Sequence, residues 1–151
     1  MRDKTDSELI RALQENAQLT AQELAARLGL SASQAARRRQ RLEAESVIQG
    51  YRAQLDPNAV GLDVQAFVQV ELRSHDPKIS SGFNKLLEFQ PEIVSAWTLT
   101  GTADLLLRIY CRDLASLNSL IHDVLLAHGA VNRVHSQIVM NQVKKDAPLP
   151  A

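Results

Sequence analysis

The chain has 151 residues, enough for one medium domain or two small ones with a real apolar core. Its 17 Lys and Arg residues balance 17 Asp and Glu residues, so net charge alone indicates no partner. The single cysteine, Cys111, excludes an internal disulfide and a multi-cysteine zinc site. No stretch resembles a signal peptide or reaches the roughly 20 apolar residues of a membrane span, so we expect a soluble, cytoplasmic protein without a membrane partner.

Three short helices are expected up to about residue 46, because apolar residues recur there at spacings of three and four. The first carries the apolar residues Leu9, Ile10 and Leu13. Capping boxes at Thr20–Glu23 and Ser31–Gln34 predict the starts of the second and third. Gly29 lies between them and tolerates the positive φ of a helix end, so the turn is predicted to be tight. We expect the third helix to end near Glu45.

The segment after the third helix predicts a domain boundary. Val47–Arg52 is typical of a short strand with a break at Gly50, and Leu55–Asn58 is typical of a turn. We therefore predict a winged-type helix-turn-helix domain at residues 1–54, a linker at 55–61 and a second domain at 62–151.

In the second half of the chain, apolar and polar residues alternate as they do in β-strands. Apolar residues at every second position from Val64 to Leu72 indicate a strand with one buried face. The order of elements is strand, helix, strand, strand, helix, strand, which predicts an α+β fold with a ferredoxin-like antiparallel sheet and two helices on one face. The expected strands are 64–72, 93–100, 104–110 and 134–143, and the expected helices are 79–89 and 114–126.

The opposite face of this sheet needs a cover. We expect apolar side chains on it, which would otherwise form a large exposed patch, so dimerisation is predicted. The residues considered for this face are Phe67, Trp97, Leu106 and Val139.

The third helix carries a cluster of positive charge. With Ala35 and Leu42 directed inward, a rotation of about 100° per residue directs Ser33, Arg37, Gln40 and Arg41 outward. Such side chains pair with base edges in the major groove of double-stranded DNA, whereas Arg38 and Arg52 are expected to contact phosphates. A solvated basic helix is the alternative. The tight turn after a preceding helix favours DNA binding. The predicted DNA-binding set is Ser31, Ser33, Gln34, Arg37, Arg38, Gln40, Arg41 and Arg52.

A family resemblance then covers nearly the whole chain in order. The segments Glu23–Ser31, Arg37–Glu43 and Val47–Tyr51 are similar to the leucine-responsive regulatory protein / AsnC (Lrp/AsnC) family. The similarity also includes the opening-helix residues Asp6, Leu9, Ile10 and Leu13, and the segments Phe67-Val68, Thr100–Leu106 and Val139-Met140. The resemblance implies a cytoplasmic transcriptional regulator that forms dimers and then tetramers, octamers or larger discs. It also implies control of amino-acid metabolism genes and an amino-acid effector.

The resemblance places the effector in a cleft between C-terminal domains of different dimers. Free backbone N–H groups in a glycine turn hold a carboxylate, and an Asp holds an ammonium group. The alternative is a plain hairpin turn in which Asp104 only caps the backbone. No other cofactor is expected. The residues carried over from the family are Thr100, Gly101, Thr102, Ala103, Asp104, Leu126, Gln137, Ile138 and Val139.

Four residues depart from the family pattern. Thr102 and Leu105 stand where many relatives carry an acidic residue and a tyrosine, so the resemblance does not identify the effector. Arg39 occupies a usually aliphatic position, so we expect its stem to cover the core while its charge reaches outward. Ser46 replaces a glycine, and a positive φ there costs a non-glycine residue about 1 kcal/mol, which predicts a strained helix end.

Other chemistry is not favoured by the sequence. Trp97 is interpreted as core or dimer packing, with a ligand-pocket wall as the alternative, and Cys111 as a buried structural thiol. The histidines have no spacing suited to a metal, and no nucleophile pairs with a base, so an enzyme is not predicted. The alternative function is an effector-independent nucleoid-architectural protein, which binds all duplexes through phosphates with the same salt dependence.

Overall fold

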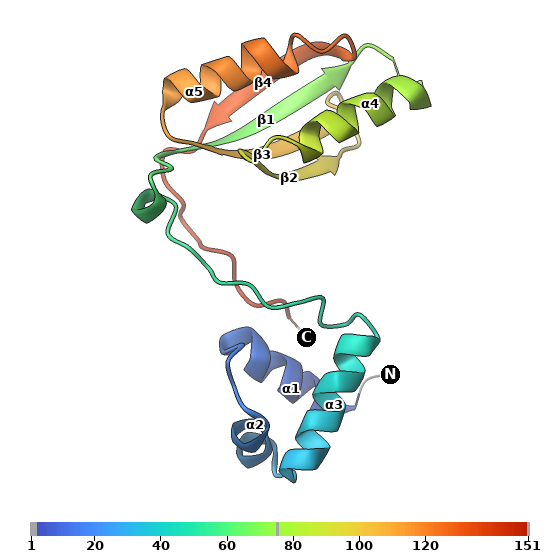
Figure 1. Cartoon of the computed structure of the whole chain (residues 1–151), viewed down its shortest axis with the longest axis vertical. Helices are drawn as coiled ribbons and strands as arrows, with labels where there is room; N and C mark the ends of the chain where they lie inside the picture. The colour runs from blue at the N-terminus through green and yellow to red at the C-terminus, as the bar shows by residue number, and fades with distance from the viewer. Residues whose placement is uncertain (1–2, 75, 151) are drawn as a thin grey trace. The chain divides into compact units, whose positions relative to one another are not determined.

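The computed structural model describes residues 3–74 and 76–150, and their contacts divide the chain into two compact units (Figure 1). The N-terminal unit comprises Met1–Gln54 and Val143–Ala151, and the C-terminal unit comprises Leu55–Gln142. Sequence analysis had placed the last residues in the C-terminal domain. They group with the N-terminal unit because Gln14 exchanges two hydrogen bonds with the backbone of Leu149, at 3.0 and 2.6 Å.

The N-terminal unit is built on the three expected helices. Side-chain caps at Asp3, Thr20 and Ser31 start them, and these accept backbone N–H groups that have no partner within the helix. The inward-facing apolar side chains form one core, which includes Leu9, Leu24, Ala35 and Leu42. The helices are α1 (Lys4–Glu15), α2 (Ala21–Leu28) and α3 (Ala32–Ala44).

The strand predicted at residues 47–52 is absent, and this prediction was wrong. The N–H groups of Val47 and Ile48 both donate to the carbonyl of Leu42, at 2.9 and 3.1 Å, so they close the end of α3 instead of joining a sheet. Ser46 takes a positive φ of 55°, which confirms the expected strain at this helix end.

The C-terminal unit has the element order expected of a ferredoxin-like fold. Its antiparallel sheet has the strand order β2-β3-β1-β4. The elements are a 3-10 turn (Asn58–Val60), β1 (Val64–Leu72), α4 (Pro77–Glu88), β2 (Ile93–Thr98), β3 (Leu105–Cys111), α5 (Leu114–Ser119), a π-helical turn η2 (Leu120–Leu125) and β4 (Val131–Ile138).

One face of the sheet forms the core of this unit, and the helices cover it (Figure 1). Val68 and Leu107 on the strands are fully buried and belong to the same cluster as Phe83 of α4 and Leu117 of α5. This arrangement confirms the α+β fold class. The thiol of Cys111 lies in the same core, where burial raises its pKa.

Two elements differ most from the bounds predicted from sequence. β4 begins at Val131 and ends at Ile138, because its length is set by pairing with β1, from Leu72↔Val131 to Ala66↔Ile138. The helix predicted to run to residue 126 changes to π geometry at Leu120. The N–H of Leu126 then donates to the carbonyl of Ile121 at 2.8 Å.

The second face of the sheet carries mixed apolar and polar side chains. Trp97 is 46% exposed and pairs in register with Leu106, and Phe67 pairs in register with Arg108. Arg108 donates to the hydroxyl of Tyr110 at 2.7 Å on this face. Phe67, Trp97 and Leu106 therefore share one face, as the sequence predicted.

Candidate nucleic-acid interface and ligand loop

The start of α3 is fixed by its own side chains. Gly29 ends α2 with a φ of 66°, and the chain enters α3 two residues later. Ser31 and Gln34 form a reciprocal capping box at 3.2 and 3.0 Å. The Oγ atoms of Ser31 and Ser33 lie 3.1 Å apart. Two of the predicted DNA-binding residues, Ser31 and Gln34, thus hold the helix start in place.

The outward face of α3 agrees with the helical geometry expected from sequence. Ala35 and Leu42 are 0% and 1% exposed, so they set the inward direction. Ser33, Arg37, Gln40 and Arg41 are all exposed. This combination of one hydroxyl, one amide and two guanidinium groups on one helix face suits hydrogen bonding to base edges.

Arg38, one of the predicted phosphate contacts, pairs with acidic side chains of the same unit. It donates to Asp3 and Asp6 of the α1 segment, at 2.7 Å in each case. Arg41 donates to the other carboxylate oxygen of Asp6. The hydrogen bond from Arg38 holds the pKa of Asp3 below its usual value, and the two carboxylates raise the pKa of Arg38.

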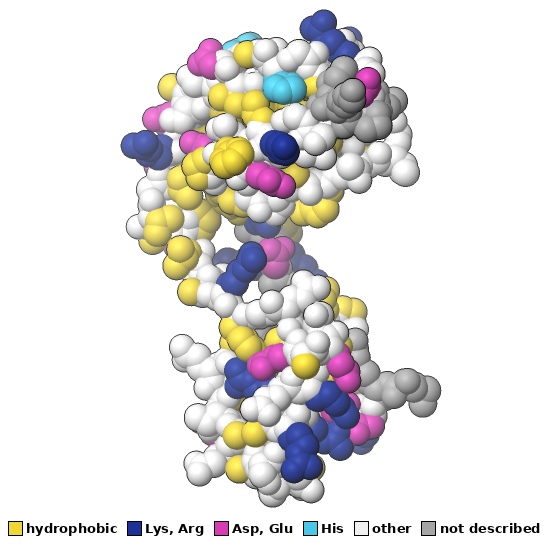
Figure 2. Space-filling view, turned by 45° about the vertical axis from the view of Figure 1, so that its right-hand side comes forward, with side chains coloured by type: hydrophobic (Ala, Val, Ile, Leu, Met, Phe, Trp, Pro, Cys, Tyr) yellow, Lys and Arg dark blue, Asp and Glu magenta, His cyan; other side chains and the backbone are white. Residues whose placement is uncertain are grey.

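Positive charge on the N-terminal unit is therefore largely paired. Figure 2 shows Lys and Arg side chains next to Asp and Glu side chains on this unit. Within residues 3–74 and 76–150, no carboxylate pairs with Arg37 or Arg52, and both are exposed. These two guanidinium groups are the ones most available to a nucleic acid.

Arg39 is held more firmly than the sequence suggested. It donates to the carbonyl of Leu19 at 3.1 Å and to Glu43 at 3.0 Å, and its guanidinium lies 4.7 Å from the ring centre of Tyr51. The Tyr51 hydroxyl also donates to Glu43 at 2.8 Å. Hydrogen bonds from Tyr51 and Arg39 lower the pKa of Glu43. These contacts of Tyr51 hold the segment that follows α3 against the helix.

The loop between β2 and β3 is fastened to β1. The N–H of Asp104 donates to the carbonyl of Val70 at 2.9 Å, and the Asp104 carboxylate accepts from the N–H of Leu72 at 2.7 Å. Gly101 has a φ of 118°, which a side chain disfavours. Asp104 therefore performs the capping role that the sequence left open, while Thr100 and Thr102 stay exposed.

The predicted ligand residues lie at two ends of the sheet. Asp104 is next to Val70, whereas Ile138 pairs with Ala66 at the other end of β1. Val70 and Ala66 are four residue steps apart along the strand, or about 13 Å. Leu126 precedes the turn into β4. The first residue of β4, Val131, pairs with Leu72, at the end of β1 that contacts the β2–β3 loop. One copy of the unit thus does not bring the whole predicted set together.

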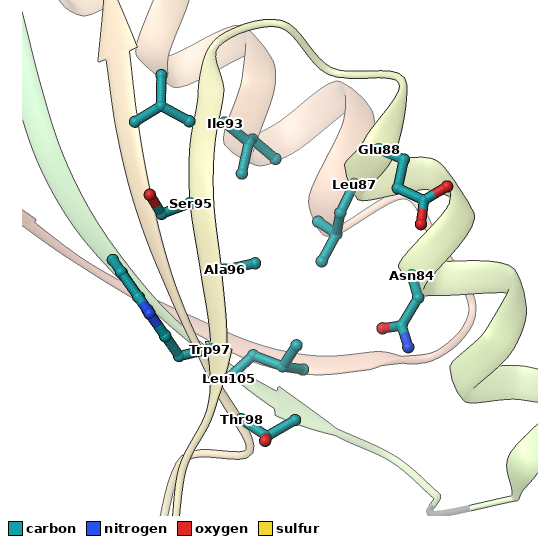
Figure 3. Close-up of a pocket in the computed structure, with 10 residues that line it drawn as sticks. Asn84, Leu87, Glu88, Ile93, Ser95, Ala96, Trp97, Thr98 and Leu105 are labelled. Atoms are coloured by element: carbon teal, nitrogen blue, oxygen red, sulfur yellow. The ribbon is translucent and has the colours of Figure 1, made fainter. Parts of the chain in front are cut away.

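A separate cavity of about 490 Å³ lies between α4 and β2. Figure 3 shows Leu87, Ala96 and Leu105 pointing into it, with Asn84 and Glu88 along the helix side. Its lining includes Thr98, two residues before the predicted ligand loop, and none of the predicted ligand residues. Trp97, for which a pocket wall was the alternative interpretation from sequence, also belongs to this lining.

Family comparisons agree with both parts of this geometry. The AsnC-type helix-turn-helix domain matches residues 3–43, and the Lrp/AsnC ligand binding domain matches residues 65–149. The chain belongs to the Lrp/AsnC family. It is a transcriptional regulator with a DNA-binding helix-turn-helix domain, and no helix in the described ranges is long and apolar enough to cross a membrane.

Relatives from the Lrp/AsnC family cover almost the full chain. The leucine-responsive regulatory protein of Rhizobium meliloti is 34% identical over 142 residues, covering 94% of this chain and 91% of that protein. The Bkd operon transcriptional regulator of Pseudomonas aeruginosa is 31% identical and covers 93% and 92%. A transcriptional regulator of Neisseria meningitidis, solved as a complex with L-Met, has a TM-score of 0.94 and 35% identity, covering 99% and 97%.

Sequence reasoning missed the acidic partners of the Lrp/AsnC recognition helix. Asp6 falls on the apolar stripe of α1, three residues before Leu9 and seven before Leu13. A carboxylate at a buried position needs a cation or several donors, so its place in the stripe was a usable signal. Tyr51 gave no such signal, because nothing in the sequence directs it towards Arg39.

Proposed function

We propose that this Lrp/AsnC regulator reads its operators with the exposed face of α3 and responds to an amino acid. Ser33, Arg37, Gln40 and Arg41 are assigned to base edges, and Arg52 to a phosphate. Ser31 and Gln34 hold the start of the helix. Arg38 is assigned to holding α3 on α1, since its Nη1 atom lies 2.7 Å from carboxylate oxygens of both Asp3 and Asp6.

One observation carries the DNA-reading proposal. Arg37 is exposed, no carboxylate of the described residues pairs with it, and it lies on a helix whose two ends are fixed. A helix positioned in this way enters the major groove without reorganisation, and only the outward side chains meet the bases. Symmetric pairs of such helices bind half-sites about 34 Å apart, so the operators are expected to be imperfect palindromes.

The proposed effector is an amino acid held between copies of the C-terminal unit. The loop Thr100–Asp104 with Leu126, and the segment Gln137–Val139, lie at two ends of one sheet, so a site that uses both needs more than one chain. The L-Met complex of the Neisseria meningitidis relative supports this effector class. Binding between copies links the effector to assembly, because the ligand contacts both partners only when they are docked.

The mixed sheet face carrying Phe67, Trp97 and Leu106 is proposed as the dimer interface. Its apolar side chains gain from leaving water, and its polar groups suit the rim of an interface. Higher assembly of dimers then forms the effector clefts. The proposed role is regulatory binding in the cytoplasm without catalysis.

The test starts from duplexes selected from a randomised library with the purified protein. Affinity for a selected duplex and for a scrambled one is measured with and without each of the twenty amino acids, together with the melting temperature of the protein. An effector that binds the folded form raises the melting temperature and changes operator affinity. Equal affinity for all duplexes, with one common salt dependence, would favour an architectural protein instead.

Asp104 separates two roles within the ligand proposal. An Asn at this position still accepts a hydrogen bond from the Leu72 N–H but lacks the charge. An Ala removes both the acceptor and the charge. We assign Asp104 to loop anchoring, so Asp104→Asn keeps the amino-acid response and Asp104→Ala loses it. Loss of response in both variants would show that the carboxylate contacts the effector ammonium group directly.

A further inference from the structure

Asp6 is a buried carboxylate in the middle of an otherwise apolar helix face. It is 4% exposed, and its neighbours on the same stripe, Leu9 and Leu13, belong to the core. Burying an ionised carboxylate costs free energy unless cations or donors compensate it. The compensation comes from α3, more than thirty residues away in sequence.

Both oxygens of Asp6 are occupied by guanidinium groups of the recognition helix. Oδ1 accepts from Nη1 of Arg38 at 2.7 Å, and Oδ2 accepts from Nη2 of Arg41. Asp3 binds the same Arg38 nitrogen and also caps the backbone N–H of Asp6, at 2.7 Å in each case. The start of α1 and the middle of α3 therefore share one ionic network.

The two arginines stand at different angles around α3. At about 100° per residue, Arg41 lies about 40° from Arg37, whereas Arg38 lies about 100° from it. The side chain of Arg41 is 49% exposed and that of Arg38 is 28% exposed. Arg41 thus reaches Asp6 from the edge of the reading face, while Arg38 lies on the flank towards α1.

We propose that Asp6 is a positioning residue for sequence recognition: it orients the Arg41 guanidinium towards a guanine and keeps Arg38 out of the DNA contact. This inference rests on the proposed function, in which α3 reads the major groove.

The chemistry of a guanidinium fits this division. Arg41 uses one N–H of Nη2 on Asp6, and the planar group keeps further N–H donors in a fixed fork. Guanine O6 and N7 accept such a pair of parallel hydrogen bonds. The hydrogen bond to Asp6 orders the Arg41 side chain before DNA binds, so less side-chain entropy is lost when Arg41 forms these two hydrogen bonds to guanine. The benefit therefore appears in discrimination between bases more than in overall charge attraction.

The primary test compares Asp6→Asn with Glu15→Gln. Both changes remove one negative charge from the N-terminal unit, but Glu15 pairs with Arg27 at 3.6 Å on α1 and α2, away from the recognition helix. The probes are a duplex selected by the wild-type protein and derivatives in which one G·C pair is replaced by A·T. Circular dichroism and the melting temperature check that each variant is folded.

The expected result is specific to one base position. Asp6→Asn lowers discrimination at one guanine of each half-site by about tenfold, in line with the loss of one well-oriented bidentate contact. Glu15→Gln leaves discrimination at every position unchanged. Its affinity for selected and scrambled duplexes rises by the same factor, since one repulsive charge is gone.

Arg41→Lys gives a second arm that does not depend on the folding of Asp6→Asn. Lysine keeps the charge but lacks the planar fork, so the salt dependence stays the same while discrimination at the same guanine falls. When Asp6→Asn folds, the double variant completes a cycle. The proposal predicts that Asp6→Asn then costs no further discrimination in the Arg41→Lys background.

The outcomes separate this inference from the proposed function. A wild-type protein that prefers no duplex contradicts both. A wild-type preference that Arg41→Lys leaves unchanged contradicts the positioning role and the assignment of Arg41 to a base edge, but not sequence reading by the rest of α3. An equal loss of affinity for all duplexes in a folded Asp6→Asn variant contradicts only the positioning role.

Discussion

In the C-terminal unit, the loop before β3 is held by backbone groups of β1, whereas in the N-terminal unit α3 is held on α1 by side-chain ion pairs. The difference follows from secondary structure. Strand edges present N–H and C=O groups to their neighbours, but a helix satisfies nearly all of its own. Two helices can therefore be fixed to each other only through side chains. The recognition helix accordingly depends on a few named residues, and the ligand loop depends on the sheet as a whole.

The largest expected effect tests whether the two units are stabilised separately. Leu107 is fully buried under the C-terminal helices, and Leu107→Ala should lower the free energy of unfolding of this unit by about 2–5 kcal/mol through lost burial and a cavity. Hydrogen exchange should show faster exchange in β1, β3 and β4 and unchanged protection in α1–α3.

Leu114→Ala is the matched control, because Leu114 in the same unit is 58% exposed and its truncation leaves no cavity. A parallel loss of protection in α1–α3 on Leu107→Ala would contradict the separation of the two units.

A smaller effect concerns the strained end of α3. Ser46→Gly should raise the stability of the N-terminal unit by about 0.5–1 kcal/mol, because glycine takes a φ of 55° without the steric cost that serine pays. Glu45 has a φ of −77°, so Glu45→Gly should destabilise instead. Melting curves of the two variants check the pair, and a lower melting temperature for Ser46→Gly would show that the serine is not strained.

The smallest expected effect compares the two capping boxes of the N-terminal unit. The hydrogen bond from the Thr20 N–H holds the pKa of Glu23 below the ordinary value of 4.5 for a glutamate. This stabilisation is therefore present above pH 4.5 and is lost as the pH falls through the lower folded-state pKa. The box at Ser31 uses the neutral Gln34 and has no such dependence.

Glu23→Gln should thus flatten the acid side of the stability curve, and Gln34→Glu should steepen it. Amide exchange in α2 and α3 between pH 5 and pH 3 provides the measurement. Identical acid profiles for the wild type and Glu23→Gln would show that the carboxylate contributes nothing to this cap.

Features governed by neighbouring residues were predictable from sequence. The capping boxes at Thr20 and Ser31, the left-handed Gly29 and the strained Ser46 all follow from local backbone requirements, and each has the expected role in the structure. The alternating apolar residues of β1 likewise gave the buried face correctly, because a strand repeats every two residues.

Features set by distant partners were less predictable. The bounds of β4 follow the length of β1, and Val47 and Ile48 close α3 because the carbonyl of Leu42 is within reach. The pairing of Arg38 with Asp3 and Asp6 joins segments more than thirty residues apart, so a helical wheel of α3 alone could not show these partners. The family resemblance gave the ligand residues, but their separation along β1 becomes visible only with the sheet register.

The central claim is that the exposed Arg37 face of α3 reads DNA sequence. Its most direct test measures the affinity ratio of a selected to a scrambled duplex across a salt series, for the wild type, Arg37→Ala and, as a control, Arg112→Ala in the C-terminal unit. Arg37→Ala should reduce the ratio by about 5- to 150-fold, a loss of about 1–3 kcal/mol, and Arg112→Ala should leave it unchanged. A wild-type ratio retained by Arg37→Ala would contradict the account.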